Sequence, residues 1–146
     1  MNTVLWLILG LVFGAALIMY ARLYRAPGEK KILAIALVIA AIIYLVFAII
    51  WGNPTWLLIE TIGIPVYGFF AWAAIRYSTY WLFVGWLLHP IWDVGLHLLG
   101  PGAFVAPEWY AVGCITFDIL VAIYILFRAK YWQQEIQGYN KALNPD

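Results

Sequence analysis

The stretch that decides the fold is "YWLFVGWLLHPIWDVGLHLL", residues 80–99. Its length and apolar character suit one membrane-spanning α-helix, which needs roughly 20 residues. Three ionisable residues, His89, Asp93 and His97, nevertheless recur in it at every fourth position. Residues four apart lie on one side of an α-helix, each turned by about 40° from the last. The stretch therefore predicts a membrane helix with a polar stripe along one side.

The overall composition also indicates an integral membrane protein. Of the 146 residues, 66% are hydrophobic and 10% are charged, whereas a soluble domain is about half apolar and about a quarter charged. The net charge of +1 gives no reason to expect a nucleic-acid partner. The one cysteine, Cys114, excludes an intramolecular disulfide and a metal site built from several cysteines. The length predicts a single transmembrane domain over residues 1–146.

Five apolar segments have the length of a membrane span, and connections rich in Pro, Gly or charge separate them. We therefore expect an all-α protein, a bundle of five transmembrane helices with a polar cytoplasmic tail. The expected helices cover about residues 3–21, 32–52, 55–75, 80–99 and 107–128, and the tail covers 129–146.

The basic residues predict the orientation of the bundle. Lys and Arg favour the cytoplasmic side of a bilayer, and all eight follow the first or third span or lie at and beyond the end of the fifth. We expect the N-terminus outside and the C-terminus inside, in the inner (cytoplasmic) membrane of a prokaryote. The first span is expected to be retained rather than cleaved as a signal peptide. The basic residues are Arg22, Arg25, Lys30, Lys31, Arg76, Arg128, Lys130 and Lys141.

Five ionisable residues lie inside the predicted spans: Glu60, His89, Asp93, His97 and Asp118. A charge at the bilayer centre costs at least ~2.5–3.5 kcal/mol on insertion scales, so such residues indicate function by default. A rise of about 1.5 Å per residue places Glu60 level with Asp93 and His97. The same count places His89 level with Asp118, near the middle of the membrane. We expect one outward-opening pocket with Glu60, Asp93 and His97 on its walls and His89 and Asp118 as its floor.

Three interpretations of this pocket stay open. It is a site for a divalent metal, with zinc favoured and Asp118 orienting a histidine from behind the ligands. Alternatively, its residues act as general acid and base, or pass protons, without a metal. In the third interpretation they only hold helices together, gaining about 0.6 kcal/mol per hydrogen bond. The expected metal ligands are Glu60, His89, Asp93 and His97.

The motif "WLLHPIWDVGLHLL", with "ETIGIPVYGFFAW" before it and "FDILVAIYI" after it, resembles a small prokaryotic family of multispanning proteins without an established activity. The resemblance covers about residues 55–128 and implies no reaction. In chemistry alone, the pocket is similar to intramembrane hydrolases such as alkaline ceramidases and adiponectin receptors, which hold zinc with three histidines and act on lipid amides. This chain has two histidines, so one protomer cannot supply that ligand set. The family resemblance rests on Glu60, His89, Trp92, Asp93, His97 and Asp118.

The function that these observations favour is a small membrane enzyme acting on a lipidic or small apolar substrate. Its catalytic residues would be Glu60, Asp93 and His97. Two alternatives stay open: a proton or small-solute transport unit, and a structural or assembly subunit of a membrane complex. The sequence alone does not decide between an enzyme and these alternatives. The expected partners are the lipid bilayer, an apolar small molecule and, if the protein is a homo-oligomer, further copies of the chain.

Overall fold

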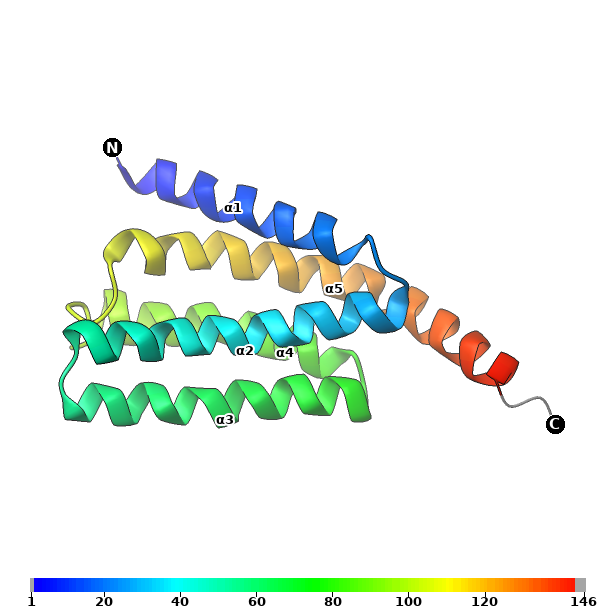
Figure 1. Cartoon of the computed structure of the whole chain (residues 1–146). Coiled ribbons are helices and arrows are strands. Elements are labelled where there is room, and N and C mark those ends of the chain that lie inside the picture. The colour runs from blue at the N-terminus through cyan, green and yellow to red at the C-terminus, as the bar shows by residue number, and fades with distance from the viewer. Residues whose placement is uncertain (1, 144–146) are drawn as a thin grey trace.

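A computed structural model describes residues 2–143, which form a bundle of helices joined by short connections (Figure 1). The described residues are all-helical, as the sequence predicted. Four of the helices, α1, α2, α3 and α5, are long and apolar enough to cross a membrane. The elements in chain order are α1 (Asn2–Ala21), α2 (Ala26–Trp51), α3 (Pro54–Arg76), α4 (Tyr80–Asp93), the π-helical segment η1 (Val94–Leu98) and α5 (Glu108–Leu143).

A short turn makes α2 and α3 an antiparallel hairpin. Asn53 precedes α3, and its side chain accepts a hydrogen bond from the backbone N–H of Trp56 at 3.1 Å. This bond satisfies one of the free donors at the start of the helix. Pro54 occupies the first helical position, where a missing N–H leaves no bond unmade. The sequence of the turn therefore fixes where α3 begins.

The fourth expected helix ends in a wider turn than predicted. α4 has 14 residues, and η1 extends it by 5 more, to Leu98. Pro90 inside α4 removes one backbone donor. The N–H of Leu99 then bonds the carbonyl of Val94, five residues back, at 2.9 Å. The span thus covers nearly the predicted residues, but its last turn is π-helical rather than α-helical.

The last helix is longer than expected, because α5 runs for 36 residues through most of the predicted tail. Residues 129–143 contain no proline, and their Gln, Glu and Lys residues are good helix formers. Trp132 is fully buried, and Ile136 packs against the same core. The turns that directly follow Arg128 therefore belong to the bundle, while the end of α5 projects beyond the other helices (Figure 1).

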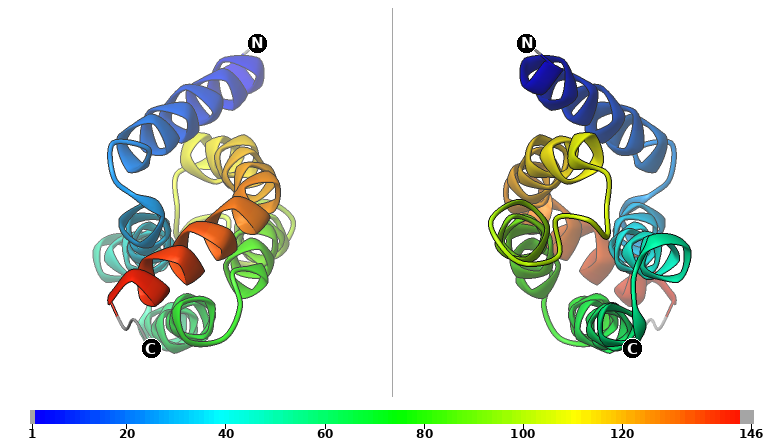
Figure 2. Two further views of the ribbon diagram at one scale, coloured as in Figure 1. Left: turned by 90° about the vertical axis from the view of Figure 1, so that its right-hand side faces the viewer. Right: turned by 90° about the vertical axis from the view of Figure 1, so that its left-hand side faces the viewer.

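The helices α1 and α5 approach each other closely. A Cβ atom on Gly10 would overlap the carbonyl oxygen of Gly113, so only glycine fits at this position. The hydroxyl of Thr116 donates to the carbonyl of Leu7 at 2.7 Å and ties the two backbones together. Small residues allow such contacts between membrane helices. The α1 helix therefore packs chiefly along α5, as both views in Figure 2 show.

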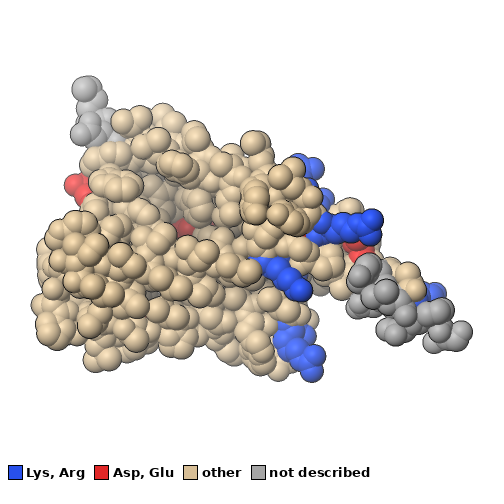
Figure 3. Space-filling view, in the orientation of Figure 1, with Lys and Arg blue, Asp and Glu red and all other residues tan. Residues whose placement is uncertain are grey.

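The two ends of the bundle differ in charge. The basic end holds the α1–α2 and α3–α4 connections and the C-terminal part of α5, and Figure 3 shows Lys and Arg side chains gathered there. The opposite end holds the start of α1, the α2–α3 turn and the loop of residues 99–107. The positive-inside rule predicts such a separation for a membrane bundle whose orientation is set by its basic residues. The direction in which the bundle crosses a membrane stays a prediction.

Candidate functional site

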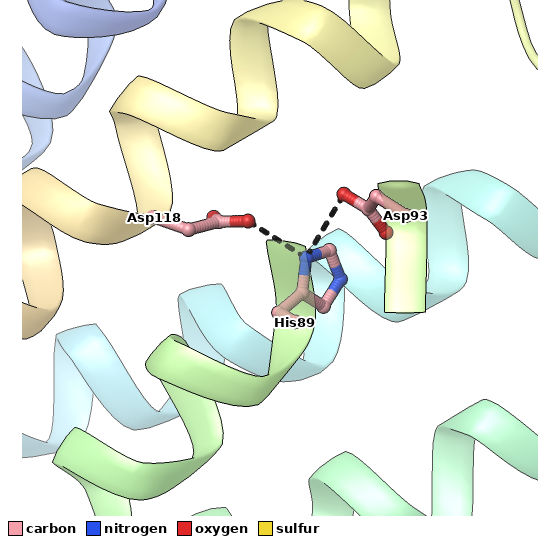
Figure 4. Close-up of side chains that lie close together, drawn as sticks. All are labelled: His89, Asp93 and Asp118. Carbon is pink, nitrogen blue, oxygen red and sulfur yellow. Dashed lines mark hydrogen bonds and ion pairs between the residues drawn. The ribbon is translucent and has the colours of Figure 1, made fainter. Parts of the chain in front are cut away.

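Three ionisable side chains meet in the interior of the bundle: His89 and Asp93 of α4 and Asp118 of α5 (Figure 4). Nδ1 of His89 lies 2.9 Å from Oδ2 of Asp118 and 3.3 Å from Oδ2 of Asp93. Each side chain is at most 1% exposed. These three residues, named the His89 cluster, therefore lie in an interior closed to bulk water.

The packing of α4 and α5 turns these side chains inward. His89 and Asp93 are four residues apart and share one side of α4. Three residues before His89, Trp86 donates from Nε1 to the carbonyl of Leu33 at 3.2 Å, which holds this side of α4 against α2. Asp118 lies on the side of α5 that carries the buried residues Ala111, Ala122 and Ile125. The cluster is thus positioned by the hydrophobic core itself.

Neither carboxylate of the His89 cluster has the donors that a buried carboxylate needs. Among the described residues, both oxygens of Asp93 and Oδ1 of Asp118 lack a hydrogen-bond partner, and so does Nε2 of His89. Two ionised carboxylates beside one imidazole leave a net negative charge, even with the imidazole protonated. An uncompensated charge in a low-dielectric interior costs several kcal/mol. The cluster must therefore share an additional proton or take up a cation.

The His89 cluster could hold a metal ion. One ligand atom from each residue lies within 4.8 Å of the other two. In a tetrahedral site with bonds of roughly 2.0–2.2 Å, ligand atoms lie roughly 3.3–3.6 Å apart. The contacts of 2.9 and 3.3 Å at His89 would therefore need to widen only slightly. A dication with two carboxylates and a neutral imidazole is also electrically balanced, and this donor set suits zinc and similar ions.

Glu60 of α3 and His97 of η1 form a second buried pair. Oε1 of Glu60 lies 3.2 Å from Nε2 of His97, and both residues are 2% exposed. On the other side of the ring, Nδ1 donates to the carbonyl of Gly102 at 3.1 Å. A single proton between Nε2 and Oε1 makes the pair either two neutral groups or one ion pair. The net charge is zero in both forms, so this pair needs no further cation.

The structure therefore divides the expected pocket into two groups. It brings Glu60 to His97 and His89 to Asp118, the pairs that the count of helical rise placed at equal depth. It does not bring Glu60 into the His89 cluster. Asp93 lies one α-helical turn from His89, whereas His97 lies within the π-helical segment η1 and meets Glu60 of α3 instead.

Tyr44 of α2 links the two groups, and the sequence analysis did not identify it. Its ring stacks on His97 with centroids 4.6 Å apart and lies 5.9 Å from the ring of His89. Its hydroxyl is buried and has no hydrogen-bond partner among the described residues. The sequence did contain an indication of its role, because Tyr44 is the one polar side chain in residues 32–50. Aromatic residues of membrane helices favour the two interfaces, whereas Tyr44 lies away from the ends of its span.

The loop of residues 99–107 covers His97 at the opposite end of the bundle. Its Gly102 donates to the carbonyl of Leu96 at 2.9 Å, and its Val105 is fully buried against Trp56. This arrangement differs from the outward-opening pocket that the sequence predicted. The loop contains apolar residues that find a hydrophobic partner in Trp56, so it folds over the polar pair rather than leaving it open.

A fourth buried acid, Glu29, lies at the basic end and was also missed. Its carboxylate accepts hydrogen bonds from Nη2 of Arg128 at 3.0 Å, from Nε1 of Trp132 at 2.7 Å and from the hydroxyl of Tyr124. Glu29 is 1% exposed. With three donors it is well satisfied, in contrast to the carboxylates of the His89 cluster. The sequence placed Glu29 in a charged connection, whereas α2 begins earlier than predicted and buries it.

The chain belongs to a family without an established activity. Residues 5–131 match the family described as "Family of unknown function (DUF6010)". This agrees with the resemblance to a family of unknown activity that the motif around His89 indicated. No curated protein and no solved structure matches the chain.

Proposed function

We propose that the protein is a small membrane-embedded enzyme whose His89 cluster binds a divalent metal, with zinc favoured, and that it acts on a lipidic or small apolar substrate. One observation carries the proposal: two buried carboxylates with unpartnered oxygens face one imidazole nitrogen (Figure 4). A bound dication would remove the net negative charge and give a partner to the carboxylate of Asp93.

The two buried groups would divide the work. His89 and Asp93 would hold the metal, with Asp118 either as the third ligand or as the group that orients His89. When bound, such a metal polarises a carbonyl or phosphoryl oxygen as a Lewis acid. The Glu60–His97 pair would supply the acid and base, because its carboxylate oxygen and ring nitrogen lie 3.2 Å apart, close enough to exchange a proton.

The exposed surface supports a membrane setting. Large apolar side chains with roughly half or more of their surface exposed occur on α1, α2, α3 and α4, and contiguous patches of this kind are rare on soluble monomers. We propose that lipid covers them in the inner membrane of a prokaryote, with the basic end in the cytoplasm. Examples on four helices are Phe13, Ile49, Leu58 and Ile91.

Metal analysis of the purified protein tests the proposal. We expect about one equivalent of divalent metal per chain, and loss of that metal in Asp93→Asn and Asp118→Asn, because each removes a negative charge from the site. Inductively coupled plasma mass spectrometry after removal of loosely bound ions gives the stoichiometry. Glu60→Gln is the matched control, since it changes a buried acid outside the His89 cluster and should retain the metal.

Two outcomes would count against this proposal. A wild-type protein without stoichiometric metal under metal-replete conditions would leave the carboxylates to share a proton instead. Loss of metal in Glu60→Gln, with retention in Asp118→Asn, would move the ion to the Glu60–His97 pair. Thermal unfolding of each variant shows whether a loss of metal merely reflects a loss of fold.

Proton transfer is the second candidate function, because Tyr44 contacts both imidazole rings. A route across the bundle would have to continue from Asp118 towards Glu29 at the basic end. Between them, Leu33, Leu37 and Ile125 are fully buried and apolar. We therefore expect no proton flux in proteoliposomes, and a flux abolished by His89→Ala would make transport the better assignment.

A further inference from the structure

The His89 cluster can be reached from the side of the bundle, through a groove between α1, α2 and α5. The groove encloses a cavity of about 570 Å³, within the range of roughly 300–1,000 Å³ that is typical of small-molecule sites. Figure 3 shows a hollow in this face with acidic atoms at its base. Its walls include Leu9, Phe13, Ile39 and Phe117, and Asp118 lies at its inner end.

Three features keep the groove open. The α1 and α2 helices are joined at the basic end and separate towards the opposite end (Figure 1). The contact of Gly10 and Thr116 with the facing backbones holds α1 on α5, and so away from α2. Where a large side chain on α2 could fill the space, the sequence has Ala36 and Ala40. The groove is thus built into the packing of α1.

We propose that this groove binds one alkyl chain of a single-chain lipid whose head carries an O–H or N–H donor, such as a long-chain alcohol or amine. The inference rests on the proposed function and names the substrate class of the same site. Its polar contact would be Asp118, a residue that is 1% exposed and lines the groove, and whose Oδ1 has no hydrogen-bond partner among the described residues. The apolar walls would take the chain.

Hydrogen bonding explains why a fatty acid or a phospholipid does not fit. An ionised carboxylate or phosphodiester head has acceptors only, so it would leave Oδ1 of Asp118 without a donor and would itself lose its hydration in the apolar groove. A hydroxyl, amide or ammonium group instead donates to the carboxylate. A neutral or cationic head is therefore the chemistry that this end of the groove selects.

The cavity on the other side of the bundle offers a contrast. It encloses about 610 Å³ between α3 and α4, and its lining, including Val66, Leu88 and Ile91, is apolar apart from Tyr67. No carboxylate lines it. A lipid chain can lie in such a cavity without any selection of its head, so the cavity serves as an internal reference for non-selective binding.

Photo-crosslinking of the full chain in lipid nanodiscs tests the inference. The probes are hexadecan-1-ol and hexadecanoic acid, each with a diazirine in the middle of the chain, and mass spectrometry locates the labelled residues. We expect the alcohol to label residues of α1, α2 and α5 that line the groove, and the acid to label them at least about tenfold less. Unlabelled hexadecan-1-ol should compete, whereas excess phosphatidylcholine should not.

A matched pair of variants on α2 sharpens the test. Ile39→Trp places a larger side chain in the groove wall, while Ile42→Trp makes the same change at an exposed residue outside it. We expect groove labelling to fall at least about fivefold in Ile39→Trp and to persist in Ile42→Trp. Equal labelling of both cavities by both probes, or equal labelling of both variants, would overturn the inference.

The metal content of the same samples separates this inference from the proposed function. Ile39→Trp changes no member of the His89 cluster and should keep the metal of the wild type. If the wild type holds no metal but the alcohol labels the groove selectively, the lipid site stands and the metal proposal fails. If metal is present and labelling is non-selective, the reverse holds.

Discussion

At the scale of single residues, the hydrogen-bond partners of each buried carboxylate distinguish structural acids from candidate functional ones. Glu29 receives three donors from α5. Asp93 and Asp118 share one imidazole and leave oxygens without partners. A protein that required only adhesion between helices would gain more from the first arrangement, because each buried polar group without a partner costs about 1–3 kcal/mol. This difference favours a functional role for the His89 cluster.

The role of Glu29 as a structural acid gives a stability prediction. Glu29→Ala should lower the free energy of unfolding by about 2–3 kcal/mol, because it leaves Trp132 and Tyr124 without an acceptor and breaks the ion pair with Arg128. This expected loss is at the low end of what breaking a buried ion pair costs, because the Arg128 side chain is 26% exposed and its charge is partly screened by solvent. Titration with SDS from mild detergent, followed by circular dichroism, measures the change.

Glu135→Ala is the control for this measurement. Its carboxylate accepts a long hydrogen bond of 3.5 Å from the backbone N–H of Ala26 and interacts with the exposed Tyr131, and the residue is partly exposed. The loss should stay below about 1 kcal/mol. Equal losses in the two variants would show that the three donors around Glu29 add no net stability.

The sequence identified every member of the His89 cluster and of the Glu60–His97 pair. The depth of a residue along a helix follows from its number and a regular rise, so the pairing of Glu60 with His97 and of His89 with Asp118 could be predicted. The direction of a side chain around the helix axis depends on packing that a sequence does not display. For that reason the place of Asp118 beside Asp93, and the stacking of Tyr44 on His97, emerged only from the structure.

At the scale of elements, the contact between α1 and α5 makes a prediction that compares two glycines of one interface. Gly10→Ala should lower the free energy of unfolding by about 1–3 kcal/mol, because its Cβ would overlap the Gly113 backbone and force the helices apart. In Gly113→Ala the nearest atom to the new Cβ is the carbonyl oxygen of Trp6 at 3.5 Å, an ordinary contact. That variant should change stability by less than about 0.5 kcal/mol.

The same SDS titration compares these two variants. A larger loss in Gly113→Ala than in Gly10→Ala would mean that α1 packs on α5 in another register. Labelling of the groove by the alcohol probe gives an independent readout, since displacement of α1 by the Gly10 substitution should also weaken the wall that Phe13 forms.

The sequence placed the helices well but missed one local departure. The apolar runs and the connections with Pro or Gly located all five helices, because local composition indicates both the length of a span and the points where it is interrupted. The π-helical turn at Val94–Leu98 adds one residue per hydrogen-bonded ring, and no residue type specifies it. The prolonged α5 was missed for a different reason, because its polar residues were interpreted as a tail although they are good helix formers.

At the scale of the whole molecule, the separation of charge predicts the topology in a cell membrane. In a Cys114→Ser background, Asn53→Cys at the opposite end should react with a membrane-impermeant maleimide in intact cells. Lys31→Cys at the basic end should react only after the membrane is opened. Labelling followed by gel shift checks both positions, and reaction of Lys31→Cys in intact cells would invert the proposed orientation.

The length of α5 has a consequence for the aqueous phase beside the membrane. Its 36 residues make a rod of about 54 Å, whereas the hydrocarbon layer is only about 30 Å thick. In a bilayer crossed by α5, the last turns would therefore extend beyond the hydrocarbon layer. Near that point, Glu29 of α2 accepts hydrogen bonds from Arg128 and Trp132 of α5. The packing of α5 in the bundle fixes the angle of these last turns. A molecule that approaches the basic end would therefore meet a rigid helix held at a fixed tilt.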